Sequence, residues 1–347
     1  MAKVLRTPAQ ALHKAVQLSA KSKDTKTVHR ISCLKSSGTE TLQKMILLNN
    51  SQKLLTLYKS LARNIPESLK VYGSVYYINH GNPFNMQVLV DSWPEYQTVI
   101  VRPQKQEMTD NMDLYRNVYR IFTKVPQKVP EVLENCEVIN WGQIFQIQGC
   151  QESLGEGIRA VAFSKSVRVK YVKASLYINE DILKLKVSDE SKAGSSYEAG
   201  LREVEHESGD PNFKFSRLDV SHAGLINAIW RPGRNERSLR YVQECLQKLP
   251  AYCLLGPDGV LVSWVGMESS CEAGMAYTVE RYRRKGKMTQ LMWSYMKYLH
   301  QKNIPFYVAI LEGNEKAHRC IMQCDFFAAA CGWHQWICYP PKINSIC

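Results

Sequence analysis

The sequence predicts an α+β fold: a mixed, mostly antiparallel sheet flanked by helices, built from two similar halves in tandem. Two observations in the C-terminal part support the fold class. Apolar runs at 251–255 and 260–268 are joined by the turn-forming residues 256–259 (Gly-Pro-Asp-Gly), which predicts a β-hairpin. At 288–299, apolar side chains recur every three or four residues, which predicts an amphipathic helix.

The expected elements of the C-terminal part follow the order helix, helix, strand, strand, strand, loop, helix, strand, helix, strand. They span 221–230, 236–249, 251–255, 260–268, 275–279, 288–299, 305–311, 314–323 and 335–339. The N-terminal part repeats a similar order. Its expected elements are a helix at 45–60, strands at 72–79, 86–91 and 98–102, and a helix at 109–124. The acidic stretch 189–211 has little periodicity, and we interpret it as a surface loop or linker.

The net charge of +13 is spread unevenly over the 347 residues. The first 44 residues hold nine Lys and Arg against Asp24 and Glu40, so about half of the excess lies there. Elsewhere we find no basic stripe with stacking aromatic side chains, and a nucleic-acid partner is not expected. No apolar run approaches the roughly 20 residues of a membrane-spanning helix. The oligomeric state cannot be read from the sequence.

The segment 1–44 is rich in Lys, Arg, Ser and Thr and has no continuous apolar core, which argues against a secretory signal. Two interpretations remain open. The segment has the composition of a mitochondrial presequence. It is equally compatible with a disordered extension upstream of an internal start at Met45.

Eleven cysteines are present, without a Cys-x-x-Cys motif, and we expect neither disulfides nor a metal site. One C-terminal cluster contains several soft ligand types: Cys320, Cys324, Cys331, His334 and Cys338. Their spacing does not match a zinc ribbon or finger, and buried free cysteines commonly act as small apolar residues.

A basic glycine turn precedes the helix at 288–299. It reads Arg283-Arg284-Lys285-Gly286-Lys287-Met288. A turn that leads into a helix N-terminus presents unpaired N–H groups and the positive end of the helix dipole, which suits a phosphate. The turn lacks the G-x-x-x-x-G-K-[ST] and G-x-G-x-x-G patterns of the common nucleotide loops. It is therefore a candidate pyrophosphate site of another class.

The pattern R-x-x-G-x-[small or apolar] between a strand and a helix resembles the acyl-CoA loop of the GNAT superfamily of N-acyltransferases. Further segments look like the glycine N-acyltransferase family, closest to its glutamine-using members. These segments are 61–90, 262–264, 271–277, 282–283 and 333–340. The resemblance covers 45–340. It implies a degenerate GNAT-like domain at 45–250 that shapes the acceptor pocket, a catalytic domain at 251–340, and a tail at 341–347.

The resemblance implies transfer of an acyl group from acyl-CoA, the co-substrate, to the amino group of glutamine or glycine. The acyl group would be aryl-acetyl, benzoyl or medium-chain. The implied location is the mitochondrion, with the cytoplasm as the alternative. A catalytically weak or inactive CoA-binding paralogue is the alternative. Glu272, eleven residues before Arg283, would be the general base, with Glu268 as substitute. Residues expected to bind acyl-CoA are Met275, Ala276, Tyr277, Thr278, Val279, Arg283, Arg284, Lys285, Gly286, Lys287, Met288 and Asn314.

Three departures from the family pattern bear on activity. Met288 places a bulky side chain where a small one is usual, which we expect to narrow the phosphate site. Asp325 replaces a glycine, so a left-handed helix end is expected there at a modest cost in stability. The tyrosine that often protonates the leaving thiolate would fall at Ile321 and is absent. Tyr277 or Tyr307 would have to replace it.

Overall fold

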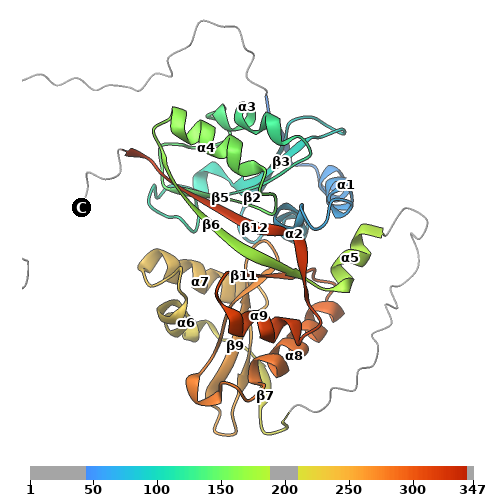
Figure 1. The fold of residues 1–347 in the computed structure, drawn as a ribbon, viewed down its shortest axis with the longest axis vertical. Coiled ribbons are helices and arrows are strands. Elements are labelled where there is room, and N and C mark those ends of the chain that lie inside the picture. The colour runs from blue at the N-terminus through green and yellow to red at the C-terminus, as the bar shows by residue number, and fades with distance from the viewer. Residues whose placement is uncertain (1–43, 188–209, 342–347) are drawn as a thin grey trace, which may run out of the picture. The chain divides into compact units, whose positions relative to one another are not determined.

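A twelve-stranded sheet runs through the part of the chain that the computed structural model describes, residues 44–187 and 210–341 (Figure 1). The strands are β1 (Ile46–Leu48), β2 (Met86–Val90), β3 (Thr98–Pro103), β4 (Val118–Thr123), β5 (Phe145–Gly149), β6 (Arg168–Ile178), β7 (Lys214–Arg217), β8 (Tyr252–Leu255), β9 (Leu261–Met267), β10 (Glu272–Thr278), β11 (Tyr307–Leu311) and β12 (Phe327–Tyr339). Their order is β1-β2-β3-β4-β5-β12-β6-β11-β10-β9-β8-β7. Two pairs, β4–β5 and β10–β11, are parallel, and the others are antiparallel.

Helices cover this sheet. They are α1 (Ser51–Ala62), α2 (Leu69–Asn79), α3 (Val129–Glu134), α4 (Leu154–Ser164), α5 (Glu180–Val187), α6 (Ala223–Ile229), α7 (Glu236–Lys248), α8 (Lys287–Gln301) and α9 (Glu315–Met322). Short 3₁₀ turns lie at η1 (Lys105–Glu107), η2 (Pro126–Lys128), η3 (Val220–His222) and η4 (Glu280–Tyr282). The predicted fold class, a mixed and mostly antiparallel sheet flanked by helices, is confirmed.

The two halves exchange strands. Next to the parallel pair β4–β5 lies β12, the last strand of the chain, and next to the parallel pair β10–β11 lies β6 from the first half. β6 and β12 pair along most of their lengths, and Figure 1 shows them running side by side between the halves. Each half therefore completes the other half's sheet.

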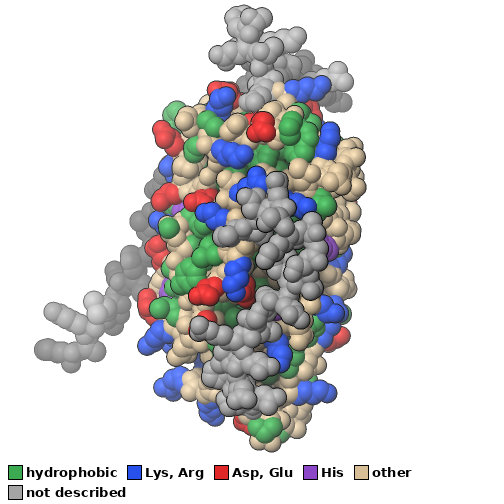
Figure 2. All heavy atoms as spheres, turned by 90° about the vertical axis from the view of Figure 1, so that its right-hand side faces the viewer, with side chains coloured by type: hydrophobic (Ala, Val, Ile, Leu, Met, Phe, Trp, Pro, Cys, Tyr) green, Lys and Arg blue, Asp and Glu red, His purple; other side chains and the backbone are tan. Residues whose placement is uncertain are grey.

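Both faces of the first half's sheet are buried. Along β3, Val99 and Val101 enter a core cluster with α1 and α2, whereas Ile100 enters a second cluster with α3 and α4. In the second half, α6, α7 and α8 pack with β8, β9 and β10 in a third cluster. On the face drawn in Figure 2, basic and acidic side chains are interspersed over the described surface.

The predicted C-terminal elements are confirmed in type and order. The hairpin turn places Gly259 at φ 73°, a left-handed conformation that favours glycine. The apolar stripe of α8, including Leu291, Tyr295 and Leu299, is buried as its spacing predicted. Two strands begin earlier than expected, β10 at Glu272 and β12 at Phe327.

The strand predicted at 72–79 is wrong, because this segment belongs to α2. Nine of the eleven α2 residues are buried, so no polar face marks a helical period. Its residues include Val71, Tyr72, Val75 and Tyr76, types that favour strands in isolation. Tertiary burial overrides that preference.

The helix predicted at 109–124 is also wrong. Asp110 and Asp113 accept hydrogen bonds from backbone N–H groups two and three residues ahead, which closes turns instead of a helix. The following β4 is buried on both faces and lacks the alternation that marks a half-exposed strand. The helix predicted at 45–60 exists only from Ser51, after the short β1.

Some predictions concern residues outside the described ranges. The presequence or extension at 1–44 lies there apart from Lys44, and the loop at 189–211 apart from its last two residues. The described helices contain none that is long and apolar enough to cross a membrane.

Candidate active site

The turn between β9 and β10 brings a buried carboxylate to the meeting point of three elements. Glu272 opens β10, and its side chain is only 9% exposed. Its Oε2 accepts hydrogen bonds from Lys70 Nζ of α2 at 2.5 Å and from Trp333 Nε1 of β12 at 2.9 Å. The predicted base is thus surrounded by residues from both halves.

Helix α2 approaches this turn so closely that only glycine fits at position 73. A Cβ there would lie 1.9 Å from the backbone oxygen of Ser270 and 2.9 Å from Cys271 Cβ. Lys70, almost one helical turn before Gly73, can therefore reach both Glu272 and Ser270 Oγ, the latter at 3.4 Å. The close contact aligns α2 with the start of β10.

A second cation, Arg120 of β4, lies next to the same turn and is 2% exposed. Its guanidinium donates to Ser269 Oγ at 2.8 Å, to Ser74 Oγ at 3.2 Å and to Gln148 Oε1 at 3.5 Å. Arg120 therefore joins α2, β5 and the β9–β10 turn through neutral partners.

Glu268, the substitute base, directly follows β9, where its backbone N–H donates to Glu272 O at 2.9 Å, and its side chain is half-buried. Burial raises the pKa of its carboxyl above the ordinary range, and the negative charge of Glu272 adds to this shift. Lys70 and Arg120 oppose the shift, and the Tyr241 hydroxyl donates to Glu268 Oε2 at 3.3 Å. Glu268 therefore keeps its proton to a higher pH than an exposed glutamate.

The two candidate tyrosines are both engaged. The Tyr307 hydroxyl donates to Ser270 Oγ at 3.2 Å, and burial raises the pKa of this tyrosine well above its usual value. The Tyr277 hydroxyl accepts from an Arg283 nitrogen at 2.7 Å. Ile321, at the position of the missing acid, is buried in the core.

Beyond Ala273 the strand β10 separates from β11. The parallel pairing includes only Glu272 with Tyr307 and Ala273 with Val308. On its other edge β10 pairs with β9, with a register shift between Gly274 and Tyr277. Within the described residues, the β11-facing edge of 274–278 has no ladder partner, so its backbone groups, apart from Thr278 O, which accepts from Arg283 Nε, can meet an extended ligand.

Val279 and Asn314 have defined backbone roles. The Val279 N–H donates to Val262 O at 2.9 Å, so this group is already used within the sheet. Asn314 caps α9 by accepting from Ala317 N at 3.4 Å, as expected of a residue that begins a helix. Asp325 has φ 59°, which confirms the predicted left-handed helix end.

The glycine turn leads into α8 as predicted. Gly286 has φ 66° and precedes the first helical residue, Lys287, without a side-chain cap. The first hydrogen bond of the helix runs from Gln290 N to Gly286 O at 2.9 Å, so the N–H groups before Gln290 precede the helical ladder. This fifteen-residue helix presents a dipole end and N–H groups suited to an anion.

The four cations of the turn divide into two kinds. Arg284 and Lys285 are exposed at the helix entrance. Arg283 instead folds onto β10, where its Nε donates to Thr278 O at 3.1 Å. Lys287 is buried with its Nζ 3.1 Å from Asp210 Oδ2. Of these four, Arg284 and Lys285 therefore leave their charge exposed at the helix entrance, although Lys285 Nζ also lies 5.9 Å from the centre of the Tyr282 ring.

Met288 packs toward the sheet. Its sulfur lies 3.9 Å from Ser263 Oγ of β9, and the side chain adds to the core of the second half. The effect of Met288 on the width of the phosphate site stays a prediction.

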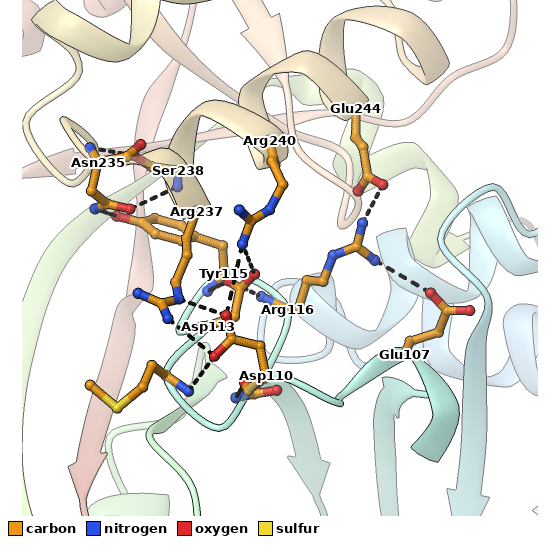
Figure 3. Close-up of polar contacts among 12 residues, drawn as sticks. Glu107, Asp110, Asp113, Tyr115, Arg116, Asn235, Arg237, Ser238, Arg240 and Glu244 are labelled. Carbon is orange, nitrogen blue, oxygen red and sulfur yellow. Dashed lines mark hydrogen bonds and ion pairs between the residues drawn. The ribbon is translucent and has the colours of Figure 1, made fainter. Parts of the chain in front are cut away.

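An ion-pair network joins the loop 105–117 of the first half to α7 of the second, as Figure 3 shows. Arg237 Nε lies 2.7 Å from Asp110 Oδ2, and Arg240 lies 3.7 Å from Asp113. Arg116 pairs with Glu107 and also with Glu244 of α7. We call these seven residues the clasp. It holds α7, which bears Tyr241, against the first half.

The cysteine cluster does not form a metal centre in the described part of the chain, where no group of three or more His, Cys, Asp or Glu side chains is arranged around a common point. Cys320 and Cys324 lie one turn apart on α9 and at its end. A hydrogen bond from Cys324 lowers the pKa of the Cys320 thiol to about 7.

A sheet with a separated parallel strand pair, a glycine-led helix N-terminus beside it and a buried carboxylate between them is the arrangement expected of an enzyme that uses an acyl-CoA thioester. The comparisons with known proteins agree. Residues 45–250 match the family described as aralkyl acyl-CoA:amino acid N-acyltransferase, and residues 252–340 match the C-terminal region of that family. The chain belongs to this family, the glycine N-acyltransferases of the GNAT superfamily.

Individual relatives support the same assignment. Human glycine N-acyltransferase-like protein 1 is 65% identical over 299 residues, which cover 86% of this chain and 99% of that protein. Human glycine N-acyltransferase is 40% identical over 302 residues, which cover 85% and 99%. An X-ray structure of a Drosophila protein, 14% identical, superposes with a TM-score of 0.63 over 86% of this chain and 99% of that one. That likeness concerns the fold alone.

Sequence reasoning missed the partners of Glu272. Lys70 lies in the segment 61–90 that carried the family resemblance, as a lone cation within an apolar run. A lysine within a buried apolar segment is rare unless it has a charged partner. The position of Lys70 in an apolar run was therefore the signal that could have indicated an ion pair. Trp333 lies in the segment 333–340 that also carried the family resemblance, and it is buried with its indole N–H bonded to the carboxylate.

Proposed function

We propose that this enzyme transfers an aryl-acetyl, benzoyl or medium-chain acyl group from CoA to the amino group of glutamine or glycine, with Glu272 as the general base. The family establishes the class of reaction, acyl-CoA:amino acid N-acyl transfer. The acceptor, the acyl group and the roles of individual residues are our proposal. The observation that supports it is a buried carboxylate at the point where β10 leaves β11.

The thioester arm would lie along the open edge of β10, from Met275 to Thr278. A backbone N–H near Met275, Ala276 or Tyr277 would polarise the thioester carbonyl. The pyrophosphate would bind the N-terminus of α8, next to Gly286, with Arg284 and Lys285 as the exposed cations. Arg283 would order β10 through its contacts with Tyr277 and Thr278.

The acceptor amine is mostly protonated near neutral pH and must lose a proton to attack. Glu272 would accept that proton as the amine nitrogen forms its bond to the thioester carbon. The carbon–sulfur bond then breaks, and CoA leaves as a thiolate that takes up a proton to become the free thiol. Because thiols have a pKa of about 8.5, a dedicated acid is helpful but not obligatory.

The test measures CoA-thiol release by the purified full chain with phenylacetyl-CoA or benzoyl-CoA, against glutamine, glycine and no acceptor. We expect acceptor-dependent release that falls by at least about 100-fold in Glu272→Gln. Glu131→Gln on α3, an exposed change, is the matched control and should leave the rate unchanged. Tight acyl-CoA binding without turnover would indicate an inactive paralogue.

We also propose a mitochondrial location, with the cytoplasm as the alternative. The support is the basic, Ser-rich composition of 1–44. A fluorescent protein fused after residue 44 should enter mitochondria, whereas a cytosolic signal that matches the fluorescent protein alone would contradict the proposal.

A further inference from the structure

The two carboxylate oxygens of Glu272 have different surroundings. Both hydrogen bonds to its side chain, from Lys70 and Trp333, end on Oε2. In the described part of the chain, no hydrogen bond to Oε1 accompanies them. A carboxylate held by one oxygen has a fixed plane, and its second oxygen is available to a substrate proton.

Two groups favour the negative charge of Glu272, the Lys70 ammonium and the Trp333 indole N–H, and of these only Lys70 carries a positive charge. Glu272 is buried, and the neighbouring carboxyl of Glu268 is of like charge. The other titratable groups that face it are Tyr307 on β11 and Cys150 after β5, and burial raises the pKa of both. Neither supplies a positive charge.

Lys70 is the direct ion-pair partner of Glu272 among the described residues. It is 1% exposed, and its Nζ also lies 5.1 Å from the centre of the Trp333 ring. Arg120, the other nearby cation, donates to Ser269 and Ser74 and forms no ion pair with Glu272 within the described residues. The charge balance of Glu272 therefore depends on a residue about 200 positions earlier.

The packing of α2 holds Lys70 in place. Gly73 allows the helix to contact the backbone of Ser270, and Ser74 accepts from Arg120 on the other side of the turn. Cys271 Sγ adds a contact to Gly73 O at 3.4 Å. A lysine with this support has little freedom to leave its partner.

We propose that Lys70 is a positioning residue for the transfer reaction: it keeps Glu272 ionised at neutral pH and, with Trp333, turns Oε1 toward the acceptor amine. This inference rests on the proposed role of Glu272 as base. The first half of the chain would then contribute to the reaction, because its helix α2 supplies the positive charge next to Glu272.

The kinetic test compares Lys70→Met, Lys70→Arg and Trp333→Phe by their pH profiles of kcat/KM with saturating acyl-CoA. We expect Lys70→Met to lose about 100-fold at pH 7 and to recover part of this above pH 9, because the acid limb of its pH profile moves upward by at least about two pH units. Lys70→Arg retains the positive charge, and the acid limb of its kcat/KM profile should lie at the same pH as in the wild-type enzyme. Trp333→Phe should lower kcat a few-fold, which is the order expected for the loss of one hydrogen bond. The acid limb of its pH profile should move little.

A uniform loss in Lys70→Met at every pH, with an unmoved acid limb, would mean that Lys70 only supports the fold and would overturn the inference. The proposed function would survive that result if Glu272→Gln still abolished turnover. Absence of acceptor-dependent turnover in the wild-type enzyme would overturn both.

A second measurement does not depend on turnover. Tm is recorded against pH for Lys70→Met, Glu272→Gln and the double variant. Without Lys70, ionising buried Glu272 opposes folding, so the Tm deficit of Lys70→Met should grow as pH rises above the ordinary glutamate pKa of about 4.3. Glu272→Gln should restore part of that deficit in the double variant. Additive losses with no pH dependence would contradict the proposed ion pair.

Discussion

The two halves of the sheet each contain a parallel strand pair that follows an antiparallel meander, β4–β5 in the first half and β10–β11 in the second. In the first half, β4 leads through Pro126 into the six-residue α3, which has proline in its first turn. In the second, β10 leads through Gly286 into the fifteen-residue α8. A longer helix with a glycine entrance has the N–H groups and the dipole end that suit an anion, which is why we propose the pyrophosphate site there and not at the short proline-led helix.

The strand pairs differ as well. In the first half, three residues of β4 pair with β5, and the Arg120 side chain bonds Gln148 across the same two strands. In the second half, pairing stops after Glu272 and Ala273. The comparison teaches that a shared topology does not by itself create a site. In the second half the open edge lies next to a fifteen-residue helix that begins after a glycine, whereas in the first half, where β4 runs past its pairing with β5, the Gln151 side chain bonds both backbone groups of Thr123.

The largest effect is expected at the contact through which the first half shapes the second. Gly73→Ala would place a methyl group 1.9 Å from Ser270 O, and we expect a loss of about 1–3 kcal/mol in unfolding free energy, or failure to fold. Chemical denaturation measures it. Gly224→Ala on α6, where nothing lies within 4 Å, is the control and should be neutral or stabilising by up to ~1 kcal/mol. Equal stabilities of the two variants would contradict the close packing.

The next prediction tests the difference between α8 and α3. Arg284→Ala combined with Lys285→Ala should weaken acyl-CoA binding by roughly 5- to 30-fold and reduce its salt dependence, because two exposed cations near the pyrophosphate are lost. Lys124→Ala with Lys128→Ala at the entrance of α3 is the matched change in the first half and should have no effect. Titration calorimetry at two salt concentrations distinguishes the outcomes. Similar losses in both pairs would mean that general charge, not the α8 entrance, attracts the ligand.

A smaller effect is expected at the clasp between the halves. The hydrogen bond from Arg237 lowers the pKa of Asp110 below its ordinary range. Since the folded-state pKa is depressed, this stabilisation is present above a pH of about 4 and is lost as pH falls through the lowered value. Asp110→Asn should cost less than ~1 kcal/mol at pH 7, since the pair is over one-third exposed, and nothing at the acid end. A deficit that persists at low pH would indicate a loss of turn hydrogen bonds instead.

The smallest effect concerns α9, the helix that follows the open strand pair. The Cys320 thiol has its pKa lowered to about 7 by a hydrogen bond from Cys324. Its alkylation by iodoacetamide should therefore rise with a midpoint near pH 7, and Cys324→Ala should move the midpoint toward the ordinary thiol value of about 8.5. Mass spectrometry of the modified peptide measures it. The exposed Cys136 of the first half serves as the internal reference.

Much of the second half could be predicted from the sequence, because its signals are local. The α8 stripe, the Gly259 hairpin and the Gly286 turn each depend on residues a few positions apart. The first half was harder to predict. Its α2 and β4 are buried on every side, so neither shows the polar face on which a period depends.

The sequence by itself determined the family, the fold class and the glycine turn that leads into α8, since these depend on short motifs and spacings. Only the tertiary structure decided which residues surround Glu272, because Lys70 and Trp333 are 202 and 61 positions away from it. It also decided that β6 and β12 cross between the halves. A buried carboxylate can be paired with a residue from any segment that the fold brings within hydrogen-bond distance. The spacing of residues along the chain therefore does not predict its partner.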